Sequence, residues 1–117
     1  MDLQIQGKKA IMAGGSAGMG RATAERLAEA GVDLVISARG KERLHRAAEE
    51  ISEKYGTTVT PVVADSSTEE GRAALFEECP DPDIIAITIK PPAPNGNFLN
   101  VTPDMWRDSI DTALIGP

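Results

Sequence analysis

Short continuous apolar runs alternate with helically spaced apolar positions along the chain, and this pattern predicts strands that alternate with helices. The runs predict strands at residues 8–13, 32–37, 57–64 and 84–89. In the third run, Pro61 predicts an irregularity, either a weakened strand or a bulge. The clearest helical stripe has apolar side chains at i, i+3, i+4, i+7 and i+11; it consists of Leu44, Ala47, Ala48, Ile51 and Tyr55. The alternation favours an α/β fold, a parallel sheet with helices on both faces.

Three further segments carry helix signals. Residues 18–30 have a set of side chains near one face, and Gly31 stands where a C-terminal cap belongs. That set is Met19, Ala22, Leu27 and Ala30. Residues 67–70 fit a capping box before a short helix, and Thr102 with Pro103 resembles an N-cap followed by proline at the first helical position.

Composition narrows the functional classes. With 117 residues the chain is long enough for a single domain, 1–117, and its net charge of −6 disfavours non-specific binding to nucleic acid or anionic membrane. No apolar run approaches the roughly 20 residues of a membrane span, and residues 1–4 lack the basic and apolar regions of a secretion signal. The single cysteine, Cys79, excludes an internal disulfide and a cysteine-rich metal site. We therefore expect a cytoplasmic protein with no nucleic-acid or membrane partner.

A glycine-dense turn, residues 13–20, joins the first predicted strand to the first predicted helix. Glycine suits such a turn because a diphosphate must approach main-chain N–H groups with no Cβ in the way. The helix that follows adds unpaired N–H groups and the positive end of its dipole. The strand, turn and helix together predict the phosphate-binding start of a nucleotide-binding βαβ unit.

The spacing Gly14-x3-Gly18-x-Gly20 is similar to the glycine motif of the short-chain dehydrogenase/reductase family, although Ala13 stands where that motif usually begins with Thr. Further landmarks continue the similarity to the end of the chain. They are Ser37-Ala38-Arg39, Asp65, Pro82-Asp83-Ile84-Ile85, Leu99 with Thr102, Pro103 and Trp106, and Asp111-Thr112-x-Leu114-x-Gly116-Pro117. The resemblance implies the N-terminal, cofactor-binding half of such a protein, with a Rossmann-type sheet of about four strands in the order 3-2-1-4.

The resemblance also implies roles for individual residues. Those expected to line the diphosphate and the adenosine ribose are Gly14, Ser16, Ala17, Gly18 and Met19. Where an NAD-preferring member carries an acid, this chain has Ala38 followed by Arg39. An arginine pairs with a 2′-phosphate that a carboxylate would repel, so NADP is expected rather than NAD. Ser37 is expected to add a hydrogen bond, and Lys41 or Arg43 a positive field. The alternative is that Arg39 is an ordinary solvated residue at a strand end.

Asp65 resembles the acid that binds the adenine amino group in this family, with Ser66 beside it. A second interpretation is purely structural, because a short acidic side chain followed by Ser67 is also typical of helix capping.

Departures from the family concern catalysis. Ile87-Thr88-Ile89-Lys90 replaces the family's Asn-Asn-Ala-Gly, and Ala113 occupies the position of the active-site asparagine, so a proton relay through it is in doubt. The family's catalytic Ser and Tyr-x-x-x-Lys lie beyond the equivalent of residue 117. The only tyrosine, Tyr55, has Val59 at i+4 and belongs to an apolar stripe. His45 is expected to be a solvated surface residue and Cys79 to pack against the sheet, with no metal-ligand constellation. The 117-residue chain alone is expected to be inactive.

Two functional hypotheses remain. The chain is either the NADP-binding part of an oxidoreductase that moves a hydride between nicotinamide and an alcohol or carbonyl carbon, or a non-catalytic nucleotide-binding or self-assembly module. A methyltransferase fits less well, because Arg39 stands near the place of a ribose-binding acid. The small-molecule substrate would be bound mostly by residues outside this chain. The apolar strand at 84–89 is expected to be an exposed edge, and homo-oligomers are expected to form through it or through the helix of Trp106.

Overall fold

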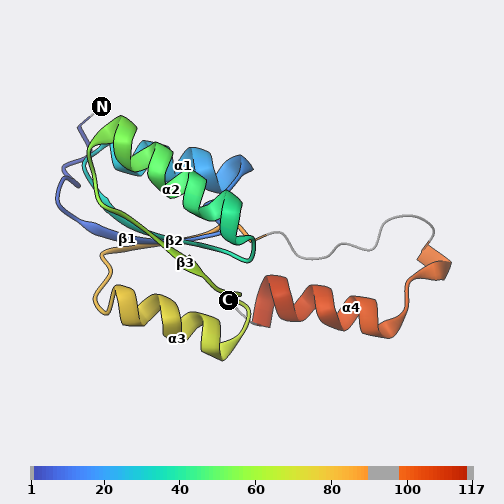
Figure 1. Ribbon diagram of the computed structural model, residues 1–117. Coiled ribbons are helices and arrows are strands. Elements are labelled where there is room, and N and C mark those ends of the chain that lie inside the picture. Colours follow the sequence, from blue (N-terminus) through green and yellow to red (C-terminus); the bar gives the residue numbers. More distant parts are fainter. Residues whose placement is uncertain (1, 90–97, 116–117) are drawn as a thin grey trace.

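The computed structural model describes residues 2–89 and 98–115, and within them four parallel strands form one sheet (Figure 1). The strands are β1 (Lys9–Ala13), β2 (Asp33–Ala38), β3 (Val59–Val63) and β4 (Ile84–Ile87). Their spatial order is β3-β2-β1-β4, and every pairing is parallel. The predicted fold class and strand order are therefore confirmed. The fourth strand ends at Ile87, earlier than expected.

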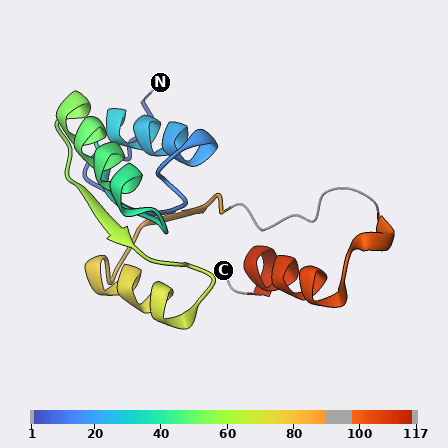
Figure 2. The same ribbon diagram turned by 45° about the vertical axis from the view of Figure 1, so that its right-hand side comes forward.

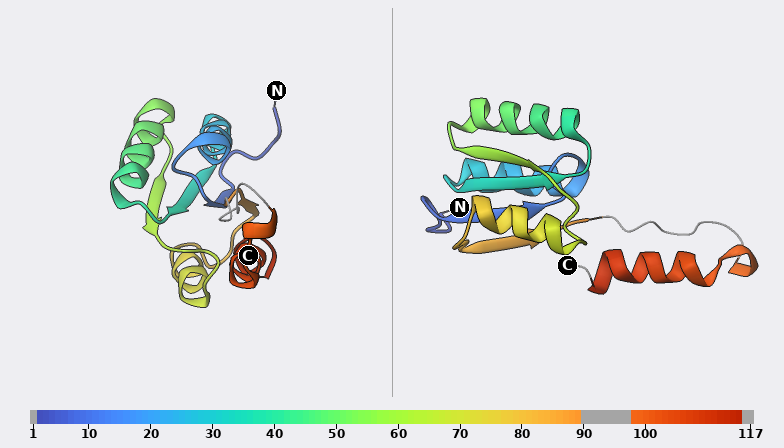
Figure 3. Two further views of the ribbon diagram at one scale, coloured as in Figure 1. Left: turned by 90° about the vertical axis from the view of Figure 1, so that its right-hand side faces the viewer. Right: turned by 60° about the horizontal axis from the view of Figure 1, so that its bottom comes forward.

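Helices cover both faces of the sheet. The helices α1 (Gly18–Glu29) and α2 (Lys41–Tyr55) lie on one face, and α3 (Glu69–Glu78) lies on the other (Figures 1 and 3). After residues 90–97, which lie outside the described part and include the loop predicted at 91–96, come a 3-10 turn (Phe98–Asn100), α4 (Pro103–Ile110) and a π-helical turn (Asp111–Ile115). Figure 2 shows that α4 lies beyond one end of the sheet, with its C-terminal end, where the π-helical turn follows, nearest to the strands. None of the described helices is long and apolar enough to span a bilayer.

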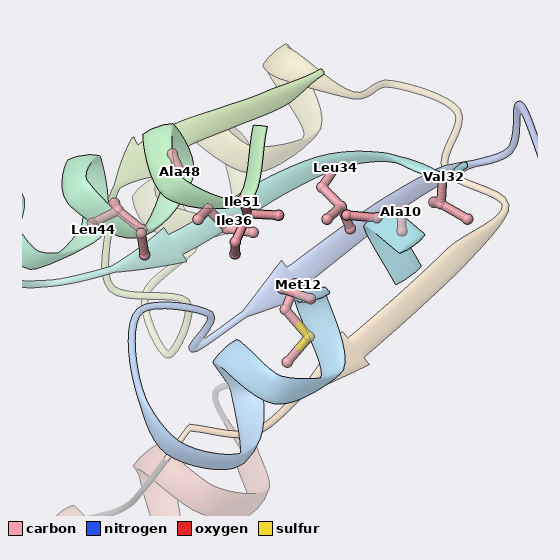
Figure 4. Packing of buried hydrophobic residues seen from close by; sticks show 11 residues of the cluster. Ala10, Met12, Val32, Leu34, Ile36, Leu44, Ala48 and Ile51 are labelled. Atoms are coloured by element: carbon pink, nitrogen blue, oxygen red, sulfur yellow. The ribbon is translucent and has the colours of Figure 1, made fainter. Parts of the chain in front are cut away.

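The core on the α1/α2 face forms where the predicted stripe of α2 meets β2. Leu44 and Ile51 are 0% and 1% exposed, and they belong to one cluster with Leu34 and Ile36 of β2 (Figure 4). Burying each such side chain stabilises the fold by about 1.5–3 kcal/mol. Tyr55 is partly buried against this cluster, and the stripe is confirmed.

The face that α1 presents to the sheet matches the predicted one only in part, because Leu27 packs against the core cluster. Met19 and Ala22 are exposed, whereas the buried positions are Gly20, Ala24 and Ala28. These three residues are spaced four apart and have little or no side chain, so their stripe packs α1 closely onto the sheet. Small size is a weaker sequence signal than hydrophobicity, which explains the error. Gly31 closes the helix as predicted, with φ +84° and its N–H donating to the carbonyl of Ala28.

The start of α3 is capped one residue later than predicted. The Thr68 hydroxyl accepts the N–H of Gly71 at 3.0 Å, while Ser67 bonds to Asp65 instead. No reciprocal capping box can form, because the third helical residue is a glycine. A Cβ at Gly71 would lie 1.8 Å from the carbonyl oxygen of Asp65, so the tight approach of α3 to this loop excludes a side chain there. At the C-cap of α3, Cys79 is buried against Ile11 and Val35 of the sheet, as predicted.

The two edges of the sheet differ. β3 keeps a regular register through Pro61, which pairs with Ile36, so neither a bulge nor a break occurs. The N–H of Ala64 donates to Ala38 across this pair, and alternate residues of a parallel strand donate to the same side. The nitrogen of Pro61 therefore lies on the outer edge, where no donor is needed. β4 has no neighbouring strand beyond β1 in the described part, and Ile85 on it is 53% exposed, as expected for an open edge.

The cap of α4 is confirmed, because the Thr102 hydroxyl accepts the N–H of Met105 at 3.2 Å and Pro103 begins the helix. No described side chain of α4 is buried, and Trp106 is 47% exposed.

Candidate functional site

A cleft of about 870 Å³ lies at the carboxyl ends of all four strands. This is the end where parallel sheets bind ligands, beside the point at which the strand order reverses between β1 and β4. The cleft brings together nine residues that the sequence assigned to direct contact with the cofactor: Gly14, Ser16, Ala17, Gly18, Met19, Ser37, Arg39, Asp65 and Ser66. Residues scattered over the first 66 positions of the sequence thus share one surface.

Three glycines of the loop after β1 have different roles. Gly14 has φ +94°, and its N–H donates to the carbonyl of Ser37 at 2.9 Å. A Cβ at Gly20 would lie 1.9 Å from the carbonyl oxygen of Gly14, so residue 20 lets α1 rest on the loop. Gly18 has φ +59° and no atom within 4 Å of the place where its Cβ would be. The space beside Gly18 is therefore open for a ligand to approach the backbone.

The N-terminus of α1 is suited to an anion. Its N-cap, Ala17, makes no side-chain capping bond, and the first turn contains no acidic residue. The first N–H groups of the helix and the positive end of its dipole consequently face the cleft without a competing carboxylate. Met19, the second residue of α1, lines the rim of the cleft and is 76% exposed. Arg21, in the same turn, pairs with Glu50 of α2 and Glu25, and the Glu50 hydrogen bond in particular raises the pKa of Arg21.

Ser37 is 1% exposed, so its side chain is buried at the base of the cleft. Its carbonyl oxygen accepts the N–H groups of both Gly14 and Gly15, at 2.9 and 3.1 Å. The residue therefore holds the glycine loop against the end of β2.

The charged residues of the cleft lie on the β2/β3 side. Arg39 follows β2, and Arg43 reaches the cleft from the first turn of α2, whereas Lys41 is absent from the lining. The Asp65 carboxylate accepts the hydroxyl of Ser67 at 2.6 Å and its N–H at 3.0 Å. These hydrogen bonds, with a smaller contribution from the charge of Arg39, lower the pKa of Asp65. Asp65 therefore stabilises the turn before α3, which agrees with the structural interpretation of this residue. Adenine binding by Asp65 is compatible with this role.

Sequence reasoning missed the residues of the cleft that lie nearest to β4. Thr88 follows that strand, and its hydroxyl donates to the carbonyls of Ala13 and Gly14, at 3.4 Å each. Thr88 therefore supports the glycine loop from the side of β4. A polar residue directly after an apolar run was the available signal. The other lining residues that were given no ligand role are Gly20, Ala38, Ala64, Ile87, Ile89 and Thr112.

Residues that the sequence set aside lie elsewhere. Tyr55 borders a separate hollow at the opposite end of the sheet, with Gln6 and Gly31. His45 is exposed and its Nδ1 contacts the carbonyl of Lys41 at 2.9 Å. Within residues 2–89 and 98–115, no three His, Cys, Asp or Glu side chains are placed to hold a metal ion. The side chain of Ala113 lies outside the described part.

A comparison with protein families identifies the group to which the chain belongs, because the model of the short chain dehydrogenase family matches residues 8–117. The chain belongs to the short chain dehydrogenase family. The matched region includes the glycine loop, the ends of all four strands and α4.

Individual members of the family agree. The chain is 33% identical over 109 residues to the uncharacterised oxidoreductase YvaG of Bacillus subtilis, which covers 91% of this chain and 40% of YvaG. The crystal structure of L-sorbose reductase from Gluconobacter frateurii, complexed with NADPH and L-sorbose, matches with a TM-score of 0.92 and 32% identity, over 99% of this chain and 45% of that one. The alcohol dehydrogenase of Thermococcus sibiricus, complexed with 5-hydroxy-NADP, matches at 0.81 and 26%, over 93% and 48%. The chain thus spans less than half the length of these relatives.

Proposed function

We propose that this chain binds NADP and forms the cofactor-binding part of a short chain dehydrogenase that moves a hydride between nicotinamide and an alcohol or carbonyl carbon. The observation that carries the proposal is the single cleft in which the glycine loop, Arg39 and Asp65 meet at the carboxyl ends of the strands. L-sorbose reductase, which matches almost the whole chain, is complexed with NADPH, and this supports the choice of cofactor.

The cleft fits a dinucleotide phosphate in three places. Gly18 and the uncapped N-terminus of α1 would hold the diphosphate, because there is open space there and no acidic residue in the first turn. Arg39 would pair with the 2′-phosphate, and Arg43 would add a second positive charge to the same side of the cleft. Asp65 and Ser66 would bind the adenine, and the bonds between Asp65 and Ser67 fix the turn that carries them.

The bound cofactor supplies the hydride, and this chain supplies binding and orientation. Ser37 positions the loop through its carbonyl, while Thr88 supports it from below. No tyrosine or histidine lines the cleft within residues 2–89 and 98–115, and we propose that the proton transfer accompanying hydride movement uses other groups of the whole protein. The 117 residues alone are therefore proposed to bind cofactor without turnover.

Calorimetric titration with NADP and with NAD tests this function on a sample shown to be folded by circular dichroism. We expect NADP to bind more tightly than NAD, because only NADP carries the phosphate that Arg39 recognises. Binding of neither nucleotide by a folded sample would overturn the proposal.

The open edge favours a second candidate, a self-assembly module. Ile85 and Ile87 are 53% and 48% exposed on a strand that has one partner strand among the described residues. Such an edge pairs readily with another chain. Association without nucleotide binding is the result that would favour this candidate over the first.

A further inference from the structure

Thr112 lines the cleft and carries a hydroxyl group, but nothing in the sequence gave it a role in binding. It is the second residue of the π-helical turn that follows α4, and it is half-buried, while Asp111 and Leu114 on the same turn are exposed. Among the described side chains of residues 98–115, it alone lines the cleft. In Figure 3 this end of the helix is the part nearest to the sheet. A π turn inside a helix is frequently found at a functional site.

The hydroxyl of Thr112 makes no hydrogen bond to another described residue. Thr88 differs, because its hydroxyl is directed to the carbonyls of Ala13 and Gly14. A threonine hydroxyl that is half-buried and lacks a protein partner can both donate to and accept from a ligand. Of the two threonines at the cleft, Thr112 is therefore the one available for binding.

Charge divides the cleft into two parts. The charged side chains of its described lining, Arg39, Arg43 and Asp65, all lie on the β2/β3 side. The β4 side is lined by uncharged residues: Ile87, Thr88, Ile89 and Thr112. A dinucleotide that places its 2′-phosphate beside Arg39 and its diphosphate at α1 extends its second nucleoside toward the uncharged side.

From this placement we infer that Thr112 is a ligand-binding residue whose hydroxyl hydrogen-bonds the ribose of the second, nicotinamide-bearing nucleoside. The inference rests on the proposed function and extends it. It also gives the segment after residue 97 a part in the site: α4 carries Thr112 to the cleft, although no described side chain of α4 itself is buried. A ribose hydroxyl matches the donor and acceptor capacity of threonine, and the neutral surroundings suit an uncharged sugar.

Two nucleotides and three variants of the 117-residue chain test this role by calorimetry. NADP contains the second nucleoside, and adenosine 2′,5′-bisphosphate lacks it. Thr112→Val removes the hydroxyl at nearly constant volume, Thr112→Ser keeps it, and Ser109→Ala is a control one turn earlier that does not line the cleft. We expect Thr112→Val to weaken NADP about three- to tenfold, the range of one hydrogen bond. Affinity for the bisphosphate should stay within about twofold, and Thr112→Ser should bind NADP nearly as the wild type does.

The possible failures are distinguishable. Unchanged NADP affinity in Thr112→Val, or equal losses for both nucleotides, would overturn the role of Thr112 while the wild type still bound the bisphosphate. An equal loss of NADP affinity in Ser109→Ala would overturn it too, because the effect would then belong to the helix. If the folded wild type binds neither nucleotide, the proposed function fails and the assignment of Thr112 fails with it.

Discussion

A Cβ atom at Gly20 would lie 1.9 Å from the carbonyl oxygen of Gly14, so the first turn of α1 rests on the glycine loop only because residue 20 has no side chain. The same position would bring that Cβ within 2.5 Å of the Thr88 hydroxyl. Three segments therefore meet at one point, which is the base of the cleft.

This contact predicts that Gly20→Ala is much more destabilising than Gly18→Ala. Gly20→Ala forces backbone apart and should lower the free energy of unfolding by about 3 kcal/mol. Gly18→Ala meets open space and should cost only the left-handed backbone penalty of about 1–2 kcal/mol. Urea denaturation followed by circular dichroism measures both. Gly40→Ala, at a negative φ with no close neighbour, is the control; it loses only the N-cap preference of glycine over alanine and should cost less than about 1 kcal/mol. Equal losses at positions 18 and 20 would contradict the packing.

The two arginines of the cleft should determine the preference for NADP. Arg39→Ala removes charge-assisted bonds to the 2′-phosphate and should weaken NADP about 10- to 100-fold, while NAD changes by less than about threefold. Arg43→Ala should show a smaller loss in the same direction. Lys41→Ala is the matched control, since Lys41 is close in sequence but does not line the cleft. Titration calorimetry gives all three values. Equal losses of NADP and NAD in Arg39→Ala would contradict the assigned role.

Asp65 should titrate below the ordinary range. Its pKa is lowered by the Ser67 hydroxyl, then the Ser67 N–H, then the charge of Arg39. A carboxylate whose pKa is depressed in the folded state stabilises the fold above its unfolded pKa of about 3.9, and this contribution is lost as the pH falls through the folded value. Carbon-detected NMR titration of the carboxyl group measures the shift.

Ser67→Ala removes the largest cause of that shift, so the pKa of Asp65 should rise toward its ordinary value. Arg39→Ala should raise it less. A larger effect from Arg39→Ala than from Ser67→Ala would mean that the ion pair, not the turn, dominates the carboxylate.

The open edge of β4 should mediate self-association. Its exposed side chain Ile85 is 53% accessible, and Ile85→Lys places a charge on the edge that opposes strand pairing. We expect light scattering to show concentration-dependent association of the wild type, reduced in Ile85→Lys. Val63→Lys, a change of similar exposure on β3, is the control and should leave association unaltered. A wild type that stays monomeric at high concentration would contradict this expectation.

The elements and their order could be predicted because strong periodic signals dominate them. The stripe of Leu44 and Ile51 specifies α2, and the apolar run of β2 specifies a strand that is buried on both faces. The buried face of α1 could not be found in this way. Gly20, Ala24 and Ala28 are small, which lets the helix backbone approach the sheet, and they give no strong hydrophobic signal. The cap at Thr68 was displaced by one residue because Ser67 was already bound to Asp65, a competition visible only in three dimensions.

The candidate site divides along similar lines. Local motifs and the family resemblance identified the glycine loop, Arg39 and Asp65, and the fold brings these into one cleft. Thr88 and Thr112 lie in segments that were compared with the family, but neither comparison gave these two side chains a role in binding. Their place depends on β4 pairing with β1 and on α4 returning to the sheet, which are long-range contacts.

The proline on β3 limits how far any assembly through the sheet can grow. If two copies join β4 to β4 across a two-fold axis, each new outer edge is a β3 strand, and the outward nitrogen of Pro61 on it has no proton to donate. A third copy meets an edge with a missing hydrogen bond at its centre. The association expected here is therefore a closed pair with eight strands, two sets of the observed four, and not an extending fibre.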